Sequence, residues 1–222
     1  MAELLPLFPL GTVLFPGMVL PLHIFEERYR QLVRDLLEHP DAPRFGVVAI
    51  REGRETGADS VSSLYDVGCI AELRDADRDD EGRIELVTIG TERFRVGQLD
   101  QSRPYLQAEI ELMPDDVADP AAAELAVSAV QASFRTYLDV LVKQGGASVL
   151  IEDLPDEPVL LSYVVAAAMI IDLPQRQALL AQPDALTRLA AERVLLASET
   201  AVLRATTSRP APDLRFAPYS PN

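Results

Sequence analysis

The run Asp75–Gly82 has the residue types, and part of the spacing, of a calcium-binding loop. Aspartates stand at alternate positions from Asp75, as do the first ligands of an EF-hand loop. The match then ends, because the sixth position of such a loop is glycine and the twelfth a bidentate glutamate, whereas this chain has Asp80 and Leu86. We therefore interpret the run as an acidic hairpin tip and expect no metal site there.

The residues that most often do nucleophilic or acid–base chemistry are few and isolated. The single lysine, Lys143, lies between Val142 and Gln144, whereas a phosphate-binding P-loop needs a lysine between glycine and serine or threonine. Neither histidine has a serine and carboxylate, or a second metal ligand, at a recognisable spacing. We expect His23 to be half-buried and His39 to be solvated. The sequence thus predicts no catalytic residue, no metal and no cofactor.

Cys69 is the only cysteine, so the chain has no partner for an intramolecular disulfide. It lies between Val67 and Ile70 in an apolar segment. We expect a buried, hydrophobic residue rather than a reactive thiol.

Several arginines admit two interpretations, an anion site or ion-paired residues at the surface and rim of a sheet. Glutamates near them in the sequence favour ion pairs. The arginines are Arg28, Arg30, Arg93 and Arg95, and the glutamates are Glu26, Glu27, Glu72 and Glu92.

Composition narrows the classes of partner. The chain has 222 residues, 48% of them hydrophobic, which suffices for a substantial core. Its net charge of −15 repels phosphate backbones, so we expect no nucleic-acid partner. The opening apolar run lacks the features of a secretory signal, and the apolar run 159–173 is shorter than the roughly 20 residues that span a bilayer. We expect a cytoplasmic protein without a membrane partner.

The elements that position these residues change in type along the chain. Residues 5–30 read as two short buried strands joined by a Pro16–Gly17 turn, followed by a helix over 25–37. Five further short segments rich in valine and isoleucine predict a small, mostly antiparallel β-barrel against which that helix packs. These segments are 44–50, 67–73, 83–89, 94–99 and 105–112.

Helical periodicity replaces the alternating pattern after Asp116. Four helices are predicted, from Pro120 to the glycines at 145–146, over about 157–171, from near Pro174, and after Asp184 as N-cap. We therefore expect an α+β protein with three parts. These are a barrel subdomain (1–116), a C-terminal α-helical bundle of four helices (117–205) and a proline-rich tail (206–222).

Four blocks of this sequence follow a known pattern. They are the opening run 5–30, residues 64–73, residues 89–96 and the segment 160–203. They resemble the Lon N-terminal domain, the substrate-binding module of ATP-dependent Lon proteases, which also occurs as a stand-alone bacterial protein. The resemblance covers about residues 3–205, and it implies a PUA-like barrel followed by helices. It also implies binding of polypeptide substrates.

The resemblance does not extend to the catalytic parts of a Lon protease. The chain has no Walker A motif, and no serine in the Gly-Pro-Ser-Ala-Gly-like setting of the protease's Ser-Lys dyad. We expect no enzymatic activity, so that another protein would cut any substrate.

The first functional hypothesis is a module that binds unfolded or degron-bearing polypeptides, as adaptor or regulator of proteolysis, in company with an ATP-dependent protease. Phe15 and Met18 flank the Pro-Gly turn, where side chains tend to be exposed, and methionine adapts to varied partners. We expect these two residues to contact the polypeptide. An unpaired strand edge could also bind a peptide by β-addition.

Two other hypotheses remain open. A small-molecule-binding regulatory domain could use a groove between barrel and bundle, with Tyr65, Phe94 and Tyr105 as candidate lining residues. A structural or adaptor role could use the tail, or the leucines that recur every seven residues from Leu189.

Overall fold

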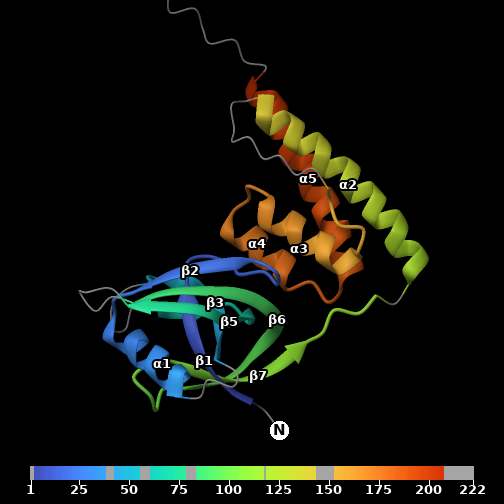
Figure 1. The fold of residues 1–222 in the computed structure, drawn as a ribbon. Helices are drawn as coiled ribbons and strands as arrows, with labels where there is room; N and C mark the ends of the chain where they lie inside the picture. Colours follow the sequence, from blue (N-terminus) through green and yellow to red (C-terminus); the bar gives the residue numbers. More distant parts are fainter. Residues whose placement is uncertain are drawn as a thin grey trace, which may run out of the picture.

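The structure, a computed structural model, describes residues 3–38, 43–55, 61–78, 84–117, 119–143 and 153–207. Within these ranges the chain forms seven strands and five helices. One helix lies between the second and third strands, and the other four follow the last strand. Figure 1 shows the sheet at one end of the molecule and four of the five helices gathered over one side of it. The strands are β1 (Glu3–Leu10), β2 (Val19–Ile24), β3 (Arg44–Gly53), β4 (Val61–Leu64), β5 (Val67–Arg78), β6 (Ile84–Asp100) and β7 (Gln107–Met113).

The sheet closes on itself. Its strands follow the order β1-β7-β6-β5-β3, and β1 also pairs with β3 in parallel, which completes a ring. All other pairings are antiparallel, with β2 added to β6 and β4 added to β3. The expected small, mostly antiparallel barrel is confirmed.

Strand β6 is longer than the sequence indicated. The segments 83–89 and 94–99, expected as two strands, form one continuous strand of 17 residues. Gly90 lies where we expected a break, but it serves a close approach instead. A Cβ atom at this position would lie 2.4 Å from the carbonyl oxygen of Phe15. Glycine therefore lets the turn before β2 rest directly on β6.

Helix α1 (Glu27–Glu38) packs against the barrel, as its spacing predicted. Tyr29, Leu32, Val33 and Leu36 are its buried residues, at intervals of three and four. The Tyr29 ring stacks on Phe8 of β1 with 4.0 Å between centroids. Burial of this apolar stripe fixes the helix on the barrel.

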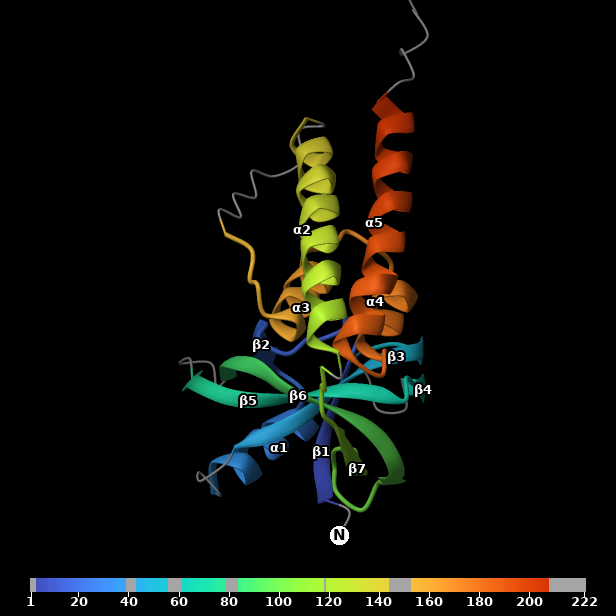
Figure 2. The ribbon, with the colours of Figure 1, turned by 90° about the vertical axis from the view of Figure 1, so that its right-hand side faces the viewer.

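The remaining helices are α2 (Pro120–Lys143), α3 (Pro158–Ala168), α4 (Leu173–Leu180) and α5 (Ala185–Thr207). In Figure 2 the long helices α2 and α5 run side by side, and α3 and α4 lie at their base, next to the barrel. Each of the predicted helices is present. Asp184 receives the backbone N–H of Thr187 at 2.8 Å, and Asp172 forms a capping box with Gln175 at the start of α4. No helix in the described ranges is long and apolar enough to cross a membrane.

The helices meet the barrel through a shared apolar cluster. Phe15 and Val67 from the barrel pack with Tyr163 of α3 and Leu179 of α4. The side-chain amide of Gln177 also donates to the carbonyl oxygen of Val67 at 2.8 Å. These contacts hold α3 and α4 against the barrel.

Several sequence-based expectations lie wholly or partly outside the described residues. They are His39, the tip of the acidic run at 79–83 and the tail from 208 onward. Helix α5 continues through Thr207.

Candidate functional site

The Pro16–Gly17 turn faces α3 and is fixed on β6. Gly17 has a φ angle of +82°, in the left-handed region that favours glycine. Its N–H donates to the carbonyl oxygen of Gly90 at 2.8 Å, and the Gly90 N–H donates to that of Met18 at 2.8 Å. The turn is thus a rigid projection from the barrel toward the helices.

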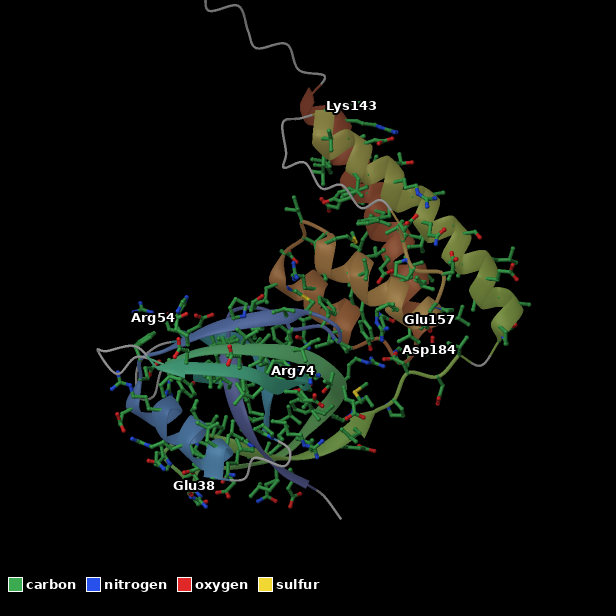
Figure 3. All side chains as sticks on the ribbon, in the orientation of Figure 1. Glu38, Arg54, Arg74, Lys143, Glu157 and Asp184 are labelled. Atoms are coloured by element: carbon green, nitrogen blue, oxygen red, sulfur yellow. The ribbon has the colours of Figure 1, made fainter. Side chains whose placement is uncertain are left out.

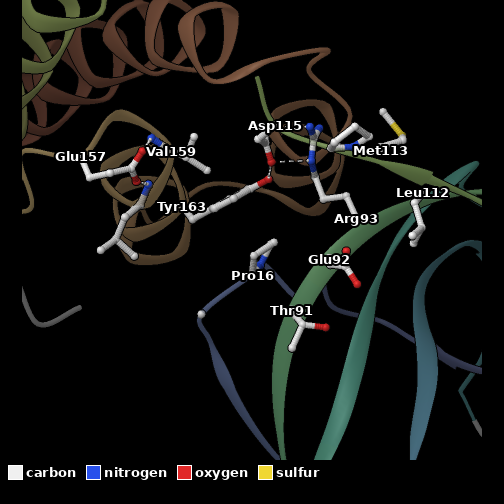
Figure 4. A pocket seen from close by; sticks show the side chains of 13 residues that line it. Pro16, Thr91, Glu92, Arg93, Leu112, Met113, Asp115, Glu157, Val159 and Tyr163 are labelled. Carbon is white, nitrogen blue, oxygen red and sulfur yellow. Dashed lines mark hydrogen bonds and ion pairs between the residues drawn. The ribbon is translucent and has the colours of Figure 1, made fainter. Parts of the chain in front are cut away.

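Two hollows lie on either side of this turn, and together they form what we call the turn–α3 groove. The larger has a volume of about 570 Å³ and the smaller about 320 Å³, and both are lined by Pro16, Gly17, Leu160 and Tyr163. Figure 4 shows the larger hollow between Pro16, the strand β6 and the first turn of α3. Its other lining residues are Thr91, Glu92, Arg93, Leu112, Met113, Pro114, Asp115, Glu157 and Val159; those of the smaller hollow are Met18, Val164, Ala167 and Ala168.

The lining of the groove is mostly apolar and partly open to solvent. Leu112 of β7 is 44% exposed and Leu160 of α3 is 46% exposed, while Met18 and Val164 are half-buried. Such an arrangement offers apolar surface to a ligand without requiring the protein to open.

A buried charge cluster underlies the groove, centred on Asp115 in the connection between β7 and α2. One Asp115 oxygen accepts from the guanidinium groups of Arg93 and Arg188, each at 2.8 Å. The other oxygen accepts from Arg93 Nε at 3.2 Å and from the Tyr163 hydroxyl. The side chains of both arginines are fully buried, and Figure 4 shows Arg93 and Tyr163 meeting at Asp115.

The two guanidinium groups also satisfy carbonyl oxygens at the end of α4. Arg93 donates to Leu180 at 2.8 Å and to Gln182 at 2.5 Å, and Arg188 donates to Leu179 at 3.1 Å. Leu179 and Leu180 belong to the last turn of α4, whose carbonyl oxygens have no N–H donor four residues further within the helix, and Gln182 follows the helix. The cluster therefore joins β6, the β7–α2 connection, α3, α4 and α5 at one point, and it sets the position of the groove's two walls.

The environment of Tyr163 favours its neutral form. Burial raises the pKa of its hydroxyl, and the hydrogen bond to Asp115 acts in the same direction, against the nearby Arg188. The Arg188 guanidinium lies 4.2 Å from the centre of the Tyr163 ring. Tyr163 therefore acts here as a hydrogen-bond donor and a wall of the groove, not as a base.

The side chain of Phe15 is not exposed to solvent, contrary to our expectation. Its side chain is fully buried, with its ring centroid 6.4 Å from that of Tyr163. The expected exposure was wrong because the helices cover this side of the turn, and burying a phenylalanine contributes roughly 1.5–3 kcal/mol. Met18, the other residue proposed from the turn, does line the groove.

Tyr65, Phe94 and Tyr105 do not line either hollow of the turn–α3 groove. Phe94 is fully buried inside the barrel, where its ring fills space left by two glycines, Gly46 and Gly68. Tyr105 lies on the side of α1 and donates to Asp35 at 2.6 Å, which anchors that helix. Tyr65 packs at the edge of the cluster that joins the barrel to α3 and α4, with the Arg51 guanidinium 5.0 Å from its ring centre, so the three aromatic residues lie in different environments.

Sequence reasoning missed the role of Arg93. We expected it to pair with glutamates at a rim, but it is buried and pairs with Asp115, 22 residues later. In a strand, Arg93 points to the face opposite Phe94, and only the later helices turn that face into an interior. No local signal distinguishes such a residue from an exposed arginine.

Other expected residues have structural roles. Cys69 is fully buried, as expected, and burial raises the pKa of its thiol. The expectation that His23 is half-buried was wrong, because its side chain is 76% exposed and its Nδ1 lies 2.9 Å from a Glu85 oxygen. In the described ranges, no group of three or more histidine, cysteine, aspartate or glutamate residues could hold a metal ion.

The chain is similar to bacterial Lon proteases over most of its length. It is 26% identical over 196 residues to Lon protease 2 of Syntrophobacter fumaroxidans, covering 86% of this chain and 24% of that protein. It is 24% identical over 201 residues to Lon protease of Escherichia coli strain K12, covering 90% of this chain and 25% of that protein. The chain therefore spans about a quarter of the length of these curated relatives.

Two solved structures have the same fold. A Lon N-terminal domain protein from Xanthomonas campestris matches with a TM-score of 0.61 and 26% identity, over 88% of this chain and 98% of that one. The N-terminal domain of Mycobacterium avium complex Lon protease matches with a TM-score of 0.64 and 18% identity, over 90% of this chain and 98% of that one. The second likeness bears on the fold alone.

The model of one family, the substrate-binding domain of ATP-dependent protease La (LON), matches residues 4–198. This match includes the barrel, the turn–α3 groove and most of the helical part, and it does not involve an ATPase or protease domain. The chain belongs to the family of LON substrate-binding domains.

Proposed function

We propose that the chain binds extended, apolar segments of unfolded or degron-bearing polypeptides in the turn–α3 groove. The observation that supports this most directly is the apolar lining of two joined hollows, open to solvent, between a fixed turn and α3. Leu112 and Leu160 offer exposed apolar surface, and Met18 adds a flexible side chain that can adjust to different partners. Recognition by shape and apolar contact suits ligands of varied sequence.

The groove is a better candidate for peptide binding than the unpaired edge of β2. Among the described strands, β2 pairs only with β6, so its other edge is unpaired. Pro21 lies in the middle of β2 and has no N–H to donate to an added strand. β-Addition at this edge would therefore lack one of its backbone hydrogen bonds.

The test is fluorescence anisotropy of a labelled, permanently unfolded protein titrated with this chain, beside its folded counterpart. The decisive variant is Met18→Ser with Leu160→Ser, which removes apolar surface from the groove. Leu125→Ser is the matched control, because Leu125 is 75% exposed on α2 and does not line the groove. Phe15→Ser is unsuitable, since the buried ring supports the fold.

Binding of the unfolded form alone, weakened in the double variant and retained in Leu125→Ser, supports the proposal. Equal binding by the double variant would refute the groove as the site. If neither form binds up to about 100 μM, which corresponds to roughly −5.5 kcal/mol, polypeptide binding itself is refuted.

We also propose a setting for this activity. As a LON substrate-binding domain without a matched catalytic domain, the chain would act in the cytoplasm as adaptor or regulator for an ATP-dependent protease. We propose that residues 1–116 and 117–205 act as two subdomains, joined at the Asp115 cluster, with the groove at their junction. Copurification with a Lon-type protease, and a change in its degradation rate on addition of this chain, would test the partnership.

A further inference from the structure

The rims of the turn–α3 groove bear acidic side chains. Glu92, on β6, is exposed at one side of the larger hollow, and Glu157, at the start of α3, is exposed at another. Figure 4 shows the two carboxylates on different walls, with Pro16 between them. No ion pair neutralises either within the part of the chain that the structure describes. A ligand in the groove therefore meets negative charge beside the apolar surface.

The carboxylate of Glu157, which Figure 3 labels at the base of the helices, caps the N-terminus of α3. Its oxygens accept the backbone N–H groups of Val159, at 3.0 Å, and Leu160. Such a cap holds the carboxylate in one place, and each oxygen retains a lone pair for a further donor. Glu157 is thus a fixed acceptor at the mouth of the groove.

The single basic residue among those that line the groove cannot offset this charge at the surface. Arg93 is buried, and its guanidinium nitrogens donate to Asp115 and to carbonyl oxygens after α4. All three nitrogens are therefore engaged on the inner side of the groove wall. Within the described part of the chain, the groove presents apolar surface and carboxylates, but no free cation, to a ligand.

We propose that the groove prefers polypeptide segments in which an apolar residue is flanked by lysine or arginine. This inference rests on the proposed function, because it names which polypeptides the same groove selects. Ammonium and guanidinium groups on long, flexible side chains can reach the rim carboxylates while the apolar residue lies in the hollow. Acidic flanks would meet repulsion from the same carboxylates and from the net charge of −15.

The test uses three labelled peptides that share the same apolar core and have flanks of lysine, glutamine or glutamate. Their binding is measured by fluorescence anisotropy at low and high salt. We expect the lysine-flanked peptide to bind about tenfold more tightly than the glutamine-flanked one, as expected for two exposed ion pairs, and to lose most of this preference at high salt. We expect the glutamate-flanked peptide to bind most weakly.

Two pairs of variants separate the rim from the overall charge of the protein. Glu92→Gln with Glu157→Gln should abolish the preference for lysine flanks, so that the lysine-flanked and glutamine-flanked peptides bind this variant alike. Glu38→Gln with Glu109→Gln changes the net charge equally at exposed sites outside the groove, and it should leave the preference intact. Circular dichroism of the variant with both substitutions would show whether its helix content is that of the wild type.

The outcomes distinguish this inference from the proposed function. If all three peptides bind alike and the Met18 and Leu160 substitutions still weaken them, the charge preference is refuted and the groove remains the site. A preference that survives in Glu92→Gln with Glu157→Gln also refutes it, because the charge acting would then lie elsewhere. If no peptide binds, the proposed function and this inference fail together.

Discussion

Glu192 on α5 is expected to make the stability of this chain fall as pH rises. Its side chain is fully buried, and neither carboxylate oxygen has a hydrogen-bond partner among the residues that the structure describes. Burial raises its pKa from the ordinary 4.5 to about 9, although Arg188, one helical turn earlier, acts to lower it. Between these two values the folded chain keeps the proton while the unfolded chain loses it. Folding therefore takes up a proton, and the free energy of folding becomes less favourable as the pH rises.

The magnitude at neutral pH follows from the lower of the two pKa values. The free energy of unfolding falls by about 1.4 kcal/mol for each pH unit above 4.5, until the pH reaches the folded-state value. At pH 7, about 2.5 units above the ordinary pKa, the loss is about 3 kcal/mol. This figure does not depend on where the folded-state pKa lies, as long as it is above 7. The loss should be complete only above about pH 9.

The variant Glu192→Gln has nearly the same shape and no ionisable proton. Urea unfolding of the wild type and the variant should be compared at about pH 5, 6, 7 and 8, with Glu124→Gln, at an exposed position of α2, as control. We expect the free energy of unfolding of Glu192→Gln to rise relative to that of the wild type by about 1.4 kcal/mol per pH unit. The difference between the control and the wild type should not change with pH. Parallel curves for wild type and Glu192→Gln would falsify the reasoning, because Glu192 would then have the same charge in both states.

Three further substitutions or labels test the structure around the groove. Asp115→Asn should lower the free energy of unfolding by about 3 kcal/mol, because it leaves two buried guanidinium groups without a counter-charge; an unchanged urea midpoint would contradict this. Gly90→Ala should cost about 2 kcal/mol in thermal unfolding, because its Cβ would lie 2.4 Å from the Phe15 carbonyl oxygen, and an unaltered melting temperature would show that the turn can move away. The buried thiol of Cys69 should react with an alkylating reagent only as fast as the barrel opens, so rapid labelling under native conditions would contradict its burial.

Periodicity predicted the elements of this fold well because most of them bury one face locally. The intervals in α1 place its apolar residues on one stripe, and the capping residue Asp184 marks the start of α5 before any tertiary contact is considered. Glycine was less informative, since the same residue can end a strand or admit a neighbouring backbone. At Gly90 it does the second, and the strand continues.

The candidate site was harder to predict because it lies between elements distant in sequence. Met18 could be proposed from its place beside a turn, and it lines the groove. Leu160 and Tyr163, on the opposite wall, come from a helix that the sequence predicted only as one of the four of the bundle. Exposure of Phe15 was misjudged because the helices that cover it begin more than a hundred residues later.

The Asp115 cluster also has a consequence for the order in which the molecule folds. Arg93 meets the carbonyl oxygen of Leu180 across 87 residues, and Arg188 meets Asp115 across 73. Both contacts attach the helices to groups that the barrel positions, Arg93 on β6 and Asp115 just after β7, so they can form only once those strands are in place. We expect the barrel to form first, with α3, α4 and α5 docking in a later step, measurable by pulsed hydrogen exchange. A nascent or partly unfolded chain would then be folded in its sheet yet have no groove, so that recognition begins only when docking is complete.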